Sequence, residues 1–247
     1  MMKHIPKLTA LLIITTALVY ADADVNTDAE FESSLNLGLT LTEGNSETIL
    51  GNAALVSEGT FSSGSSLRAG VEGNYGESRI DDTRQTTVEN VRGFTHYRKN
   101  VSKRWYAALN AAALYDKIAE IDYRAILGPA LGGYLIRRDN LTLSAEIGPS
   151  YVWEKVSRES DDYLALRIAE RLEYELSETA KIWQSAEFIP KTEDFEDFLV
   201  TAEVGVNSAM TSRMQLRVVL QLSHDSTPGA DLEKNDFTLI SGLGIRL

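Results

Sequence analysis

The chain has 247 residues, no Cys and three His, and its formal net charge is -12. The missing thiols exclude disulfides, Cys-ligated metals and a Cys nucleophile, and the acidic balance disfavours nucleic acid as a partner. A mean hydropathy of -0.16 does not separate a soluble protein from a membrane β-barrel, because only alternate strand residues of a barrel face lipid.

Residues 1–23 have the three parts of a secretory signal peptide. Two lysines precede an apolar run over residues 8–19, and the small residues Ala21 and Ala23 each offer a cleavage site. The apolar run is shorter than the roughly 20 residues that a membrane-spanning helix needs. We therefore expect residues 24–247 to form an exported mature protein.

The mature chain alternates between apolar and polar residues in about twelve blocks of roughly ten to fifteen residues. Clusters of Gly, Asn, Asp and Ser separate the blocks and predict turns. The clearest apolar faces are, in chain order, Leu35, Leu37, Leu39 and Leu41; Leu141, Leu143, Ala145, Ile147, Pro149, Tyr151 and Trp153; Phe198, Val200, Ala202, Val204 and Val206; Met214, Leu216, Val218, Leu220 and Leu222; and Phe237, Leu239, Leu243, Ile245 and Leu247. No helical periodicity or linker divides the chain, so the pattern predicts one domain of strands.

Two blocks are ambiguous. In residues 164–176, Glu170 falls among the apolar positions, where a carboxylate facing lipid would cost free energy. This block therefore predicts either a bulge or a facing different from the one that simple alternation indicates. Residues 88–97 do not indicate a face clearly.

Strands of about ten residues, tilted by about 40°, span the hydrocarbon core of a membrane. An even strand number places both termini on one side, which we take as periplasmic. Short turns are then expected on that side near residues 62, 101, 139, 178 and 211. Loops are expected on the outer side near residues 45, 82, 119, 160, 193 and 230. Aromatic residues collect at both strand ends under this topology, as in the two interfacial girdles of membrane barrels.

A soluble β-sandwich or lipocalin-like barrel also alternates, but it buries its apolar face. Here the opposite face carries too many charges for the core of a small sandwich, whereas a wet lumen can hold them in pairs. The predicted fold is all-β, a single antiparallel transmembrane β-barrel of about 12 strands. Its predicted lumen-lining residues are Arg68, Glu72, Asp116, Arg124, Glu146, Arg167, Arg171, Glu173, Glu203, Arg217 and Arg246.

Several segments resemble, in the same order, the bacterial salt-induced outer membrane protein family, which is built on a domain of unknown function. The central segment is YDKIAEIDYRAILGPALGGYLI at residues 115–136, and LGLTLTEGNSET at residues 37–48 is similar to the first hairpin of the family. Later likenesses lie in residues 143–155, 166–190 and 235–247. The resemblance covers nearly all of the mature chain and implies an outer-membrane barrel of undefined activity, with a link to salt stress. The terminal Leu247 departs from the Phe that ends many outer-membrane barrels.

His224 is the main candidate for catalysis, because some outer-membrane barrels cleave lipids with a Ser-His pair. Ser223 precedes it, but adjacent strand residues point to opposite faces, so these two side chains are not expected to pair. We expect His224 to be an interfacial, lipid-facing residue, and His96 has no evident partner in the sequence. No enzyme activity is predicted, and a lipid-modifying, phospholipase-like enzyme is the alternative.

Acidic residues gather at three of the expected outer hairpins, where they could hold Ca²⁺ or Mg²⁺ against lipopolysaccharide phosphates. No EF-hand-like spacing is present, so solvated loops are the simpler interpretation, and neither a metal nor a cofactor is predicted. The residues concerned are Asp116, Glu120 and Asp122; Glu159, Asp161 and Asp162; and Glu193, Asp194, Glu196 and Asp197.

The sequence thus predicts a monomeric barrel in the outer membrane of a Gram-negative cell, exported through a cleaved signal peptide. Its expected role is structural, or that of a narrow pore for small solutes linked to salt or osmotic stress. Long inward side chains leave little room inside about twelve strands, which favours a narrow or occluded lumen. The expected partners are outer-membrane lipid, lipopolysaccharide and, for insertion, the barrel-assembly machinery; nucleic acid is not expected.

Overall fold

The computed structural model describes residues 30–42, 47–80, 83–229 and 232–247. The predicted signal peptide, residues 1–23, lies outside these residues. In the described part of the chain, no helix has the length and apolar character needed to cross a membrane.

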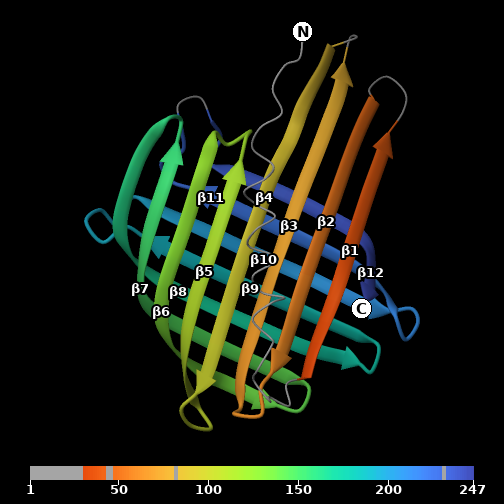
Figure 1. The fold of residues 1–247 in the computed structure, drawn as a ribbon, viewed down its shortest axis with the longest axis vertical. Helices are drawn as coiled ribbons and strands as arrows, with labels where there is room; N and C mark the ends of the chain where they lie inside the picture. The colour runs from red at the N-terminus through yellow and green to blue at the C-terminus, as the bar shows by residue number, and fades with distance from the viewer. Residues whose placement is uncertain (1–29, 43–46, 81–82, 230–231) are drawn as a thin grey trace, which may run out of the picture.

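The described residues form twelve strands that close into one antiparallel barrel, as predicted. Each strand pairs with its neighbours in sequence, and β12 pairs with β1 to close the barrel (Figure 1). The strands are β1 (Glu30–Thr42), β2 (Glu47–Thr60), β3 (Ser65–Ile80), β4 (Thr83–Asn100), β5 (Trp105–Asp116), β6 (Ile121–Arg138), β7 (Leu141–Val156), β8 (Glu159–Ser177), β9 (Ala180–Pro190), β10 (Phe198–Ala209), β11 (Met214–Asp225) and β12 (Asn235–Arg246).

Most apolar side chains point out of the barrel, and most polar side chains point into it. On β1, Leu37 and Leu39 are 49% and 67% exposed, whereas Asn36, which precedes Leu37, is 4% exposed. On β7, Ile147 is 51% exposed and its neighbour Glu146 is 8% exposed. A soluble sandwich would show the reverse, so the exposures fit a barrel whose outer surface lies in lipid.

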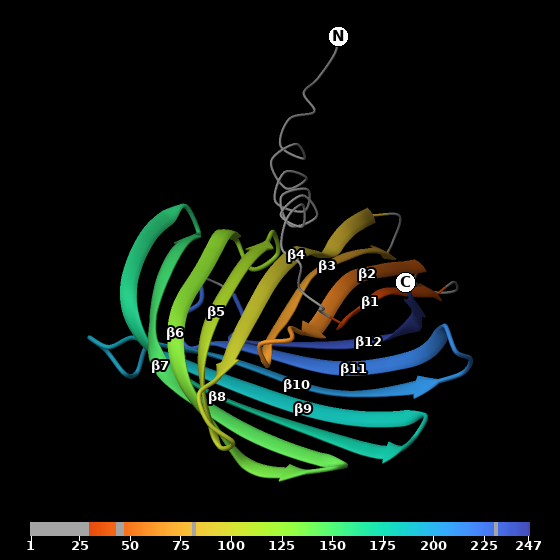
Figure 2. The same ribbon diagram turned by 60° about the horizontal axis from the view of Figure 1, so that its bottom comes forward.

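The two ends of the barrel differ. At the end where β1 begins and β12 ends, which we call the terminal end, the strands are joined by short turns. The two longest connections join β9 to β10 and β11 to β12 at the opposite end, which we call the loop end. Two walls face each other across the interior, with β1 to β5 on one side and β8 to β11 on the other (Figure 2).

Aromatic side chains lie outside the barrel near both ends. The terminal-end band includes Phe61, Trp105 and Tyr174, and the loop-end band includes Tyr123, Tyr151, Trp153, Phe198 and Phe237. Within these bands, the rings of Tyr151 and Trp153 lie 4.7 Å apart between centroids. Two such girdles are typical of strands that cross a bilayer.

Glu170 on β8 lies on the apolar outer face that simple alternation indicates, so the expectation of a different facing is wrong. The register of this block does shift between Glu175 and Ser177 opposite β9, but not beside Glu170. The β7–β8 register runs unbroken from Leu141 opposite Tyr174 to Val156 opposite Glu159. Instead, the side-chain amide of Gln184 on β9 donates a hydrogen bond to the Glu170 carboxylate on the same face. A polar partner on the next strand therefore accommodates the carboxylate.

Another register shift lies in β4. The β3–β4 register shifts between Gly76 and Glu77, which leaves Thr87 as an extra residue in β4. Thr87 directly precedes the ambiguous block 88–97, in which the aromatic Phe94 lies on the same inward face as Arg92 and His96. The mixed chemistry of this face, and not the bulge, makes its alternation unclear. Beyond the bulge, the inward residues of β4 that line the interior are Asn90, Arg92, Phe94, His96 and Arg98.

Candidate functional site: a charged lumen

The barrel encloses a cavity of about 700 Å³. Its lining comes from β2 to β12 and from connections at the loop end, including Ile118, Pro228 and Leu232. Inward residues nearer the terminal end, such as Trp183 and Lys181, do not belong to this lining. The cavity therefore extends from the loop end to Arg68 and Arg98 near the terminal ends of β3 and β4, and we call it the vestibule.

Most of the predicted lumen residues meet in this vestibule. Those that line it are Arg68, Glu72, Asp116, Arg124, Glu146, Arg167, Arg171, Glu203 and Arg217. Glu173 lies closer to the terminal end, where its carboxylate is 2.8 Å from Arg171 Nε and 2.9 Å from Lys181 Nζ. Arg246 sits at the terminal rim, with a 57% exposed side chain 3.9 Å from the Glu32 carboxylate.

Glu146 on β7 is the hub of the largest cluster. Its carboxylate lies 2.9 Å from Arg167 Nη1, 2.9 Å from His96 Nε2 and 3.7 Å from Arg98 Nη2. The Tyr106 hydroxyl donates to the same carboxylate at 3.0 Å. Only 6% of the Glu146 side chain is exposed, so the carboxylate has lost its hydration. These contacts compensate for that loss. His96 thus has a partner, which sequence reasoning did not find.

A second cluster bridges the lumen. Arg124 on β6 places Nε 2.5 Å from Glu154 on β7 and Nη2 2.7 Å from Asp225 on β11. The strands β6 and β11 do not pair with each other, so the second contact crosses the interior. This bridge narrows the lumen near the loop end.

Amides line the wall formed by β2 to β5. The side chain of Asn52 donates to Asn74 at 2.8 Å, Asn74 donates to Asn90 at 2.8 Å, and Asn90 donates to Asp116 at 3.2 Å. The row satisfies each amide through the next strand, as buried polar groups require. The interior is therefore polar on both walls, with its charges concentrated outside this row.

Three stacks of a glycine, an aromatic ring and an arginine narrow the interior further. A Cβ atom on Gly132 or Gly205 would lie 2.1 Å or 2.0 Å from the ring of Tyr106 or Trp183, so each ring lies flat against its glycine. Arginine guanidiniums cover the other ring faces at 4.2 to 5.2 Å from the centroids, within the range of cation–π contacts. The stacks are Gly70–Phe94–Arg68, Gly132–Tyr106–Arg98 and Gly205–Trp183–Arg217.

A barrel with an apolar exterior and a charged interior is the arrangement of outer-membrane barrels. A family model described as "Protein of unknown function, DUF481" matches residues 35–246. The chain belongs to this family. A search of curated proteins found no match.

The solved structures that are similar to this DUF481 chain include two porins. The NanC porin is similar with a TM-score of 0.54 at 10% identity, over 87% of this chain and 100% of that chain. The translocator domain of the autotransporter NalP from Neisseria meningitidis has a TM-score of 0.46 at 12% identity, over 97% of each chain. The KdgM porin in complex with disordered oligogalacturonate has a TM-score of 0.46 at 9% identity, over 87% of this chain and 98% of that chain. At this identity, the likeness to the NanC porin shows the fold.

The DUF481 chain holds several lumen residues that sequence reasoning missed. They include Arg92, His96 and Arg98 on β4, Glu154 on β7, Glu187 on β9 and Asp225 on β11. The β4 residues could have been found by counting alternate positions back from Asn100. The bulge conceals this pattern only in the first part of β4.

His224 of the DUF481 chain faces outward, in the orientation that the alternation predicted. Its ring stacks on Phe198 with centroids 5.3 Å apart, and its Nδ1 lies 2.8 Å from the Asn235 side-chain oxygen. Ser223 lines the vestibule on the inner side of the same strand. The two side chains therefore do not form a nucleophile and base pair. Within the described ranges, no group of three His, Asp or Glu residues is arranged to hold a metal ion.

Proposed function

We propose that the protein is an outer-membrane barrel that passes small solutes through a narrow, charged lumen. The observation that supports this function is the cavity of about 700 Å³, lined by ionised side chains from opposing walls. Ionised side chains that pair with each other keep a lumen wet, and a wet path is the first requirement for conduction.

The width of the path supports small solutes rather than large ones. The Arg124–Asp225 bridge crosses the interior near the loop end, and the Trp183 ring fills space nearer the terminal end. A cavity of this volume is comparable with a pocket for one small molecule. Passage therefore requires the side chains at the narrow points to move aside, and solutes pass one at a time.

Single-channel recording of the refolded full chain in planar bilayers tests the pore. The wild type is expected to show small, steady conductance steps. The substitution Trp183→Ala removes a ring from the interior and should raise the conductance by about twofold or more, since conductance follows the narrowest section. The matched control is Trp153→Ala, whose ring lies outside the barrel and should leave the step size unchanged. Silence from both the wild type and Trp183→Ala would reject the pore and leave a structural barrel.

Location and partners belong to the same proposal. A signal peptide over residues 1–23 would deliver the chain to the envelope, and the barrel-assembly machinery would insert it as a monomer among phospholipid and lipopolysaccharide. Fractionation and heat-modifiable gel mobility test the location, and recovery in the inner-membrane fraction would reject it. A link to salt stress predicts that a deletion strain loses viability at raised osmolarity and regains it with the wild-type gene.

The proposal contains no catalytic step. A lipid-modifying barrel would need a base beside a nucleophile, and the inner-facing Ser223 and outer-facing His224 do not meet this requirement. A phospholipid-hydrolysis assay on the wild type, His96→Ala and His224→Ala tests this. If the wild type hydrolyses phospholipid and either substitution abolishes that activity, the pore hypothesis would be rejected in favour of an enzyme.

A further inference from the structure

The closing seam between β1 and β12 is much shorter than either strand. Only four positions pair, from Ser34 opposite Arg246 to Leu37 opposite Leu243. In contrast, β1 pairs with β2 at 13 positions, and β11 pairs with β12 at 11. In Figure 1 the C-terminal part of β12 lies beside the middle of β1, and the rest of β12 runs away from it. We call the segments 39–42 and 235–241, which flank this divergence, the unpaired seam.

Two glycines mark the point where the strands diverge. A Cβ atom on Gly242 would lie 2.3 Å from the Leu37 carbonyl oxygen, and one on Gly38 would lie 2.7 Å from the Ser241 carbonyl oxygen. The two backbones therefore cross in direct contact, which only residues without a side chain permit. Because of this close crossing, the β1–β12 ladder exists only on the terminal-end side. The loop-end half of the seam has no ladder hydrogen bonds between β1 and β12.

Backbone groups without a ladder partner are not tolerated against lipid. Each unsatisfied N–H or C=O in hydrocarbon costs several kcal/mol, and such backbone persists at membrane depth only where it lines a wet cavity. The unpaired seam must therefore communicate with the polar interior. A small cavity of about 10 Å³ lies at this place, and its lining includes both Gly242 and Leu37, whose side chain belongs to the outer face.

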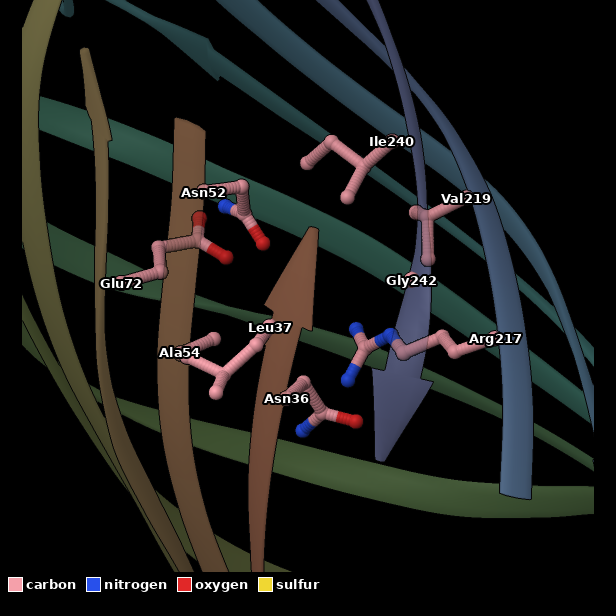
Figure 3. Close-up of a pocket in the computed structure, with 9 residues that line it drawn as sticks. All are labelled: Asn36, Leu37, Asn52, Ala54, Glu72, Arg217, Val219, Ile240 and Gly242. Atoms are coloured by element: carbon pink, nitrogen blue, oxygen red, sulfur yellow. The ribbon is translucent and has the colours of Figure 1, made fainter. Parts of the chain in front are cut away.

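The inner side of the seam presents one cationic side chain, Arg217, beside the apolar side chains of Val219 and Ile240. Arg217 stacks on Trp183 and forms no ion pair with any residue in the described ranges. Figure 3 shows Arg217 and Glu72 on opposite sides of the small cavity. Glu72 is already paired with Arg92 at 3.5 Å, so Arg217 is the group available to an anion.

The outer side of the seam presents unusually exposed apolar side chains. Leu39 and Leu41 on β1 are 67% and 66% exposed, and Phe237 and Leu239 on β12 are 71% and 64% exposed. In the paired part of the same strands, the values fall to 49% for Leu37 and to 42% and 39% for Leu243 and Ile245. The seam therefore offers a bed for an apolar chain outside and a cationic group inside.

We propose that the unpaired seam is a lateral access site for an anionic, single-chain amphiphile of the fatty-acid class. The acyl chain lies in the outer part of the bilayer against Leu39, Leu41 and Leu239. The carboxylate passes between β1 and β12, accepts hydrogen bonds from backbone N–H groups of the unpaired seam and reaches Arg217. This route is separate from axial passage of small solutes through the lumen.

A binding assay by energy transfer tests the site. The chain has three Trp, and the double substitution W105F/W153F leaves Trp183, beside Arg217, as the sole donor. A dansyl-labelled undecanoate in detergent solution should give saturable transfer that unlabelled palmitate competes away. A trimethylammonium amphiphile of the same chain length should not compete. R217M should weaken the affinity by about tenfold or more, as expected for loss of a charged hydrogen-bond donor.

The matched control for Arg217 is Arg246, which also belongs to the inner face but lies at the terminal rim beside Glu32. R246M should leave the affinity unchanged. Transfer that does not saturate, or that R217M and R246M affect equally, would overturn the proposal.

A cross-link tests the route. The chain has no Cys, so paired Cys can be introduced cleanly. Continuing the register by two residues from Leu37 and Leu243 places Leu39 opposite Ser241. L39C/S241C, closed by oxidation or by a bismaleimide, should abolish saturable binding, whereas the oxidised control L35C/I245C joins residues that already pair and should leave binding intact. Equal binding by both cross-linked forms would reject the lateral route. Dimers formed by the single L39C variant would show that a strand of a second copy covers the seam, and would also overturn the proposal.

Discussion

Arg124 and Asp225 lie 101 residues apart in sequence and meet across the lumen, with Nη2 2.7 Å from Oδ2. Their side chains are 10% and 19% exposed, so water screens the contact weakly. The same arginine also holds Glu154 on the neighbouring strand. One guanidinium thus joins the two walls of the barrel.

The substitution Asp225→Asn should weaken this bridge while keeping the side-chain size and the contact of Oδ1 with the Thr227 N–H. Because Arg124 keeps Glu154, we expect a loss of about 2 kcal/mol, less than complete removal of a buried partner would give. Guanidinium unfolding in lipid vesicles measures it. The control Glu32→Gln alters an exposed pair at the rim and should change stability by under about 1 kcal/mol. Equal losses for both variants would contradict the bridge.

Glu146→Gln should have a larger effect. Arg167 and Arg98 both approach this carboxylate, as does the His96 ring, and removing its charge leaves two buried guanidiniums without their common partner. The expected loss is about 3–5 kcal/mol by the same unfolding assay. If the variant does not refold, the fraction of heat-modifiable barrel on a gel, compared with Glu32→Gln, gives the direction. Wild-type stability or folding yield would contradict the role of Glu146 as hub.

Gly205→Ala tests a glycine–aromatic–arginine stack. The added Cβ would lie 2.0 Å from the Trp183 ring, so the ring must move and release Arg217. A loss of about 1–3 kcal/mol is expected from overpacking, with a red shift of Trp183 emission in the W105F/W153F background. Gly51→Ala is the control, since the nearest atom there lies 3.9 Å away. An unshifted emission maximum for Gly205→Ala would mean that the ring does not rest on this glycine.

Strand positions and facings could be predicted from the sequence because they depend on local alternation. Leu37 and Asn36 face opposite sides for the same reason in any strand, and lipid outside the barrel decides which of them points outward. The lumen charges on strands with clean alternation, such as Glu146 and Arg217, follow from the same rule.

Partners across the lumen could not be predicted, because they depend on closure and register. The contact of Arg124 with Asp225 requires β6 to face β11, and the sequence contains no local signal for that. The position of His96 beside Glu146 could not be predicted because β4 and β7 do not pair, so the contact depends on closure of the barrel. Glu170 was misjudged because its partner Gln184 lies on another strand, diagonally placed.

The β9–β10 connection should detach at high pH. Lys191 lies 2.9 Å from Asp161 and 4.6 Å above the Tyr163 ring, and the hydrogen bond to Asp161 raises the pKa of Lys191 above its ordinary 10.5. A raised pKa stabilises the attached loop at lower pH, and this contribution is lost as the pH rises through the folded-state pKa. The anisotropy of a dye on F195C should therefore fall above about pH 10.5. In K191M it should already be low and independent of pH, and a K191M anisotropy equal to that of the wild type at neutral pH would reject the attachment.

Glu170 and Gln184 form a polar pair on a surface that otherwise meets lipid, which makes their removal informative. Glu170→Leu alone leaves the Gln184 amide unpaired, and Gln184→Leu alone leaves the carboxylate unpaired, so each should destabilise the barrel by about 1–3 kcal/mol. The double variant E170L/Q184L presents two apolar side chains to lipid and should be at least as stable as the wild type, because an outward carboxylate is itself unfavourable in a bilayer. Unfolding in vesicles for all four forms gives the coupling energy between the two positions. Additive losses, with the double variant the least stable of the four, would show that the two side chains act independently and that this face meets water or protein instead of lipid.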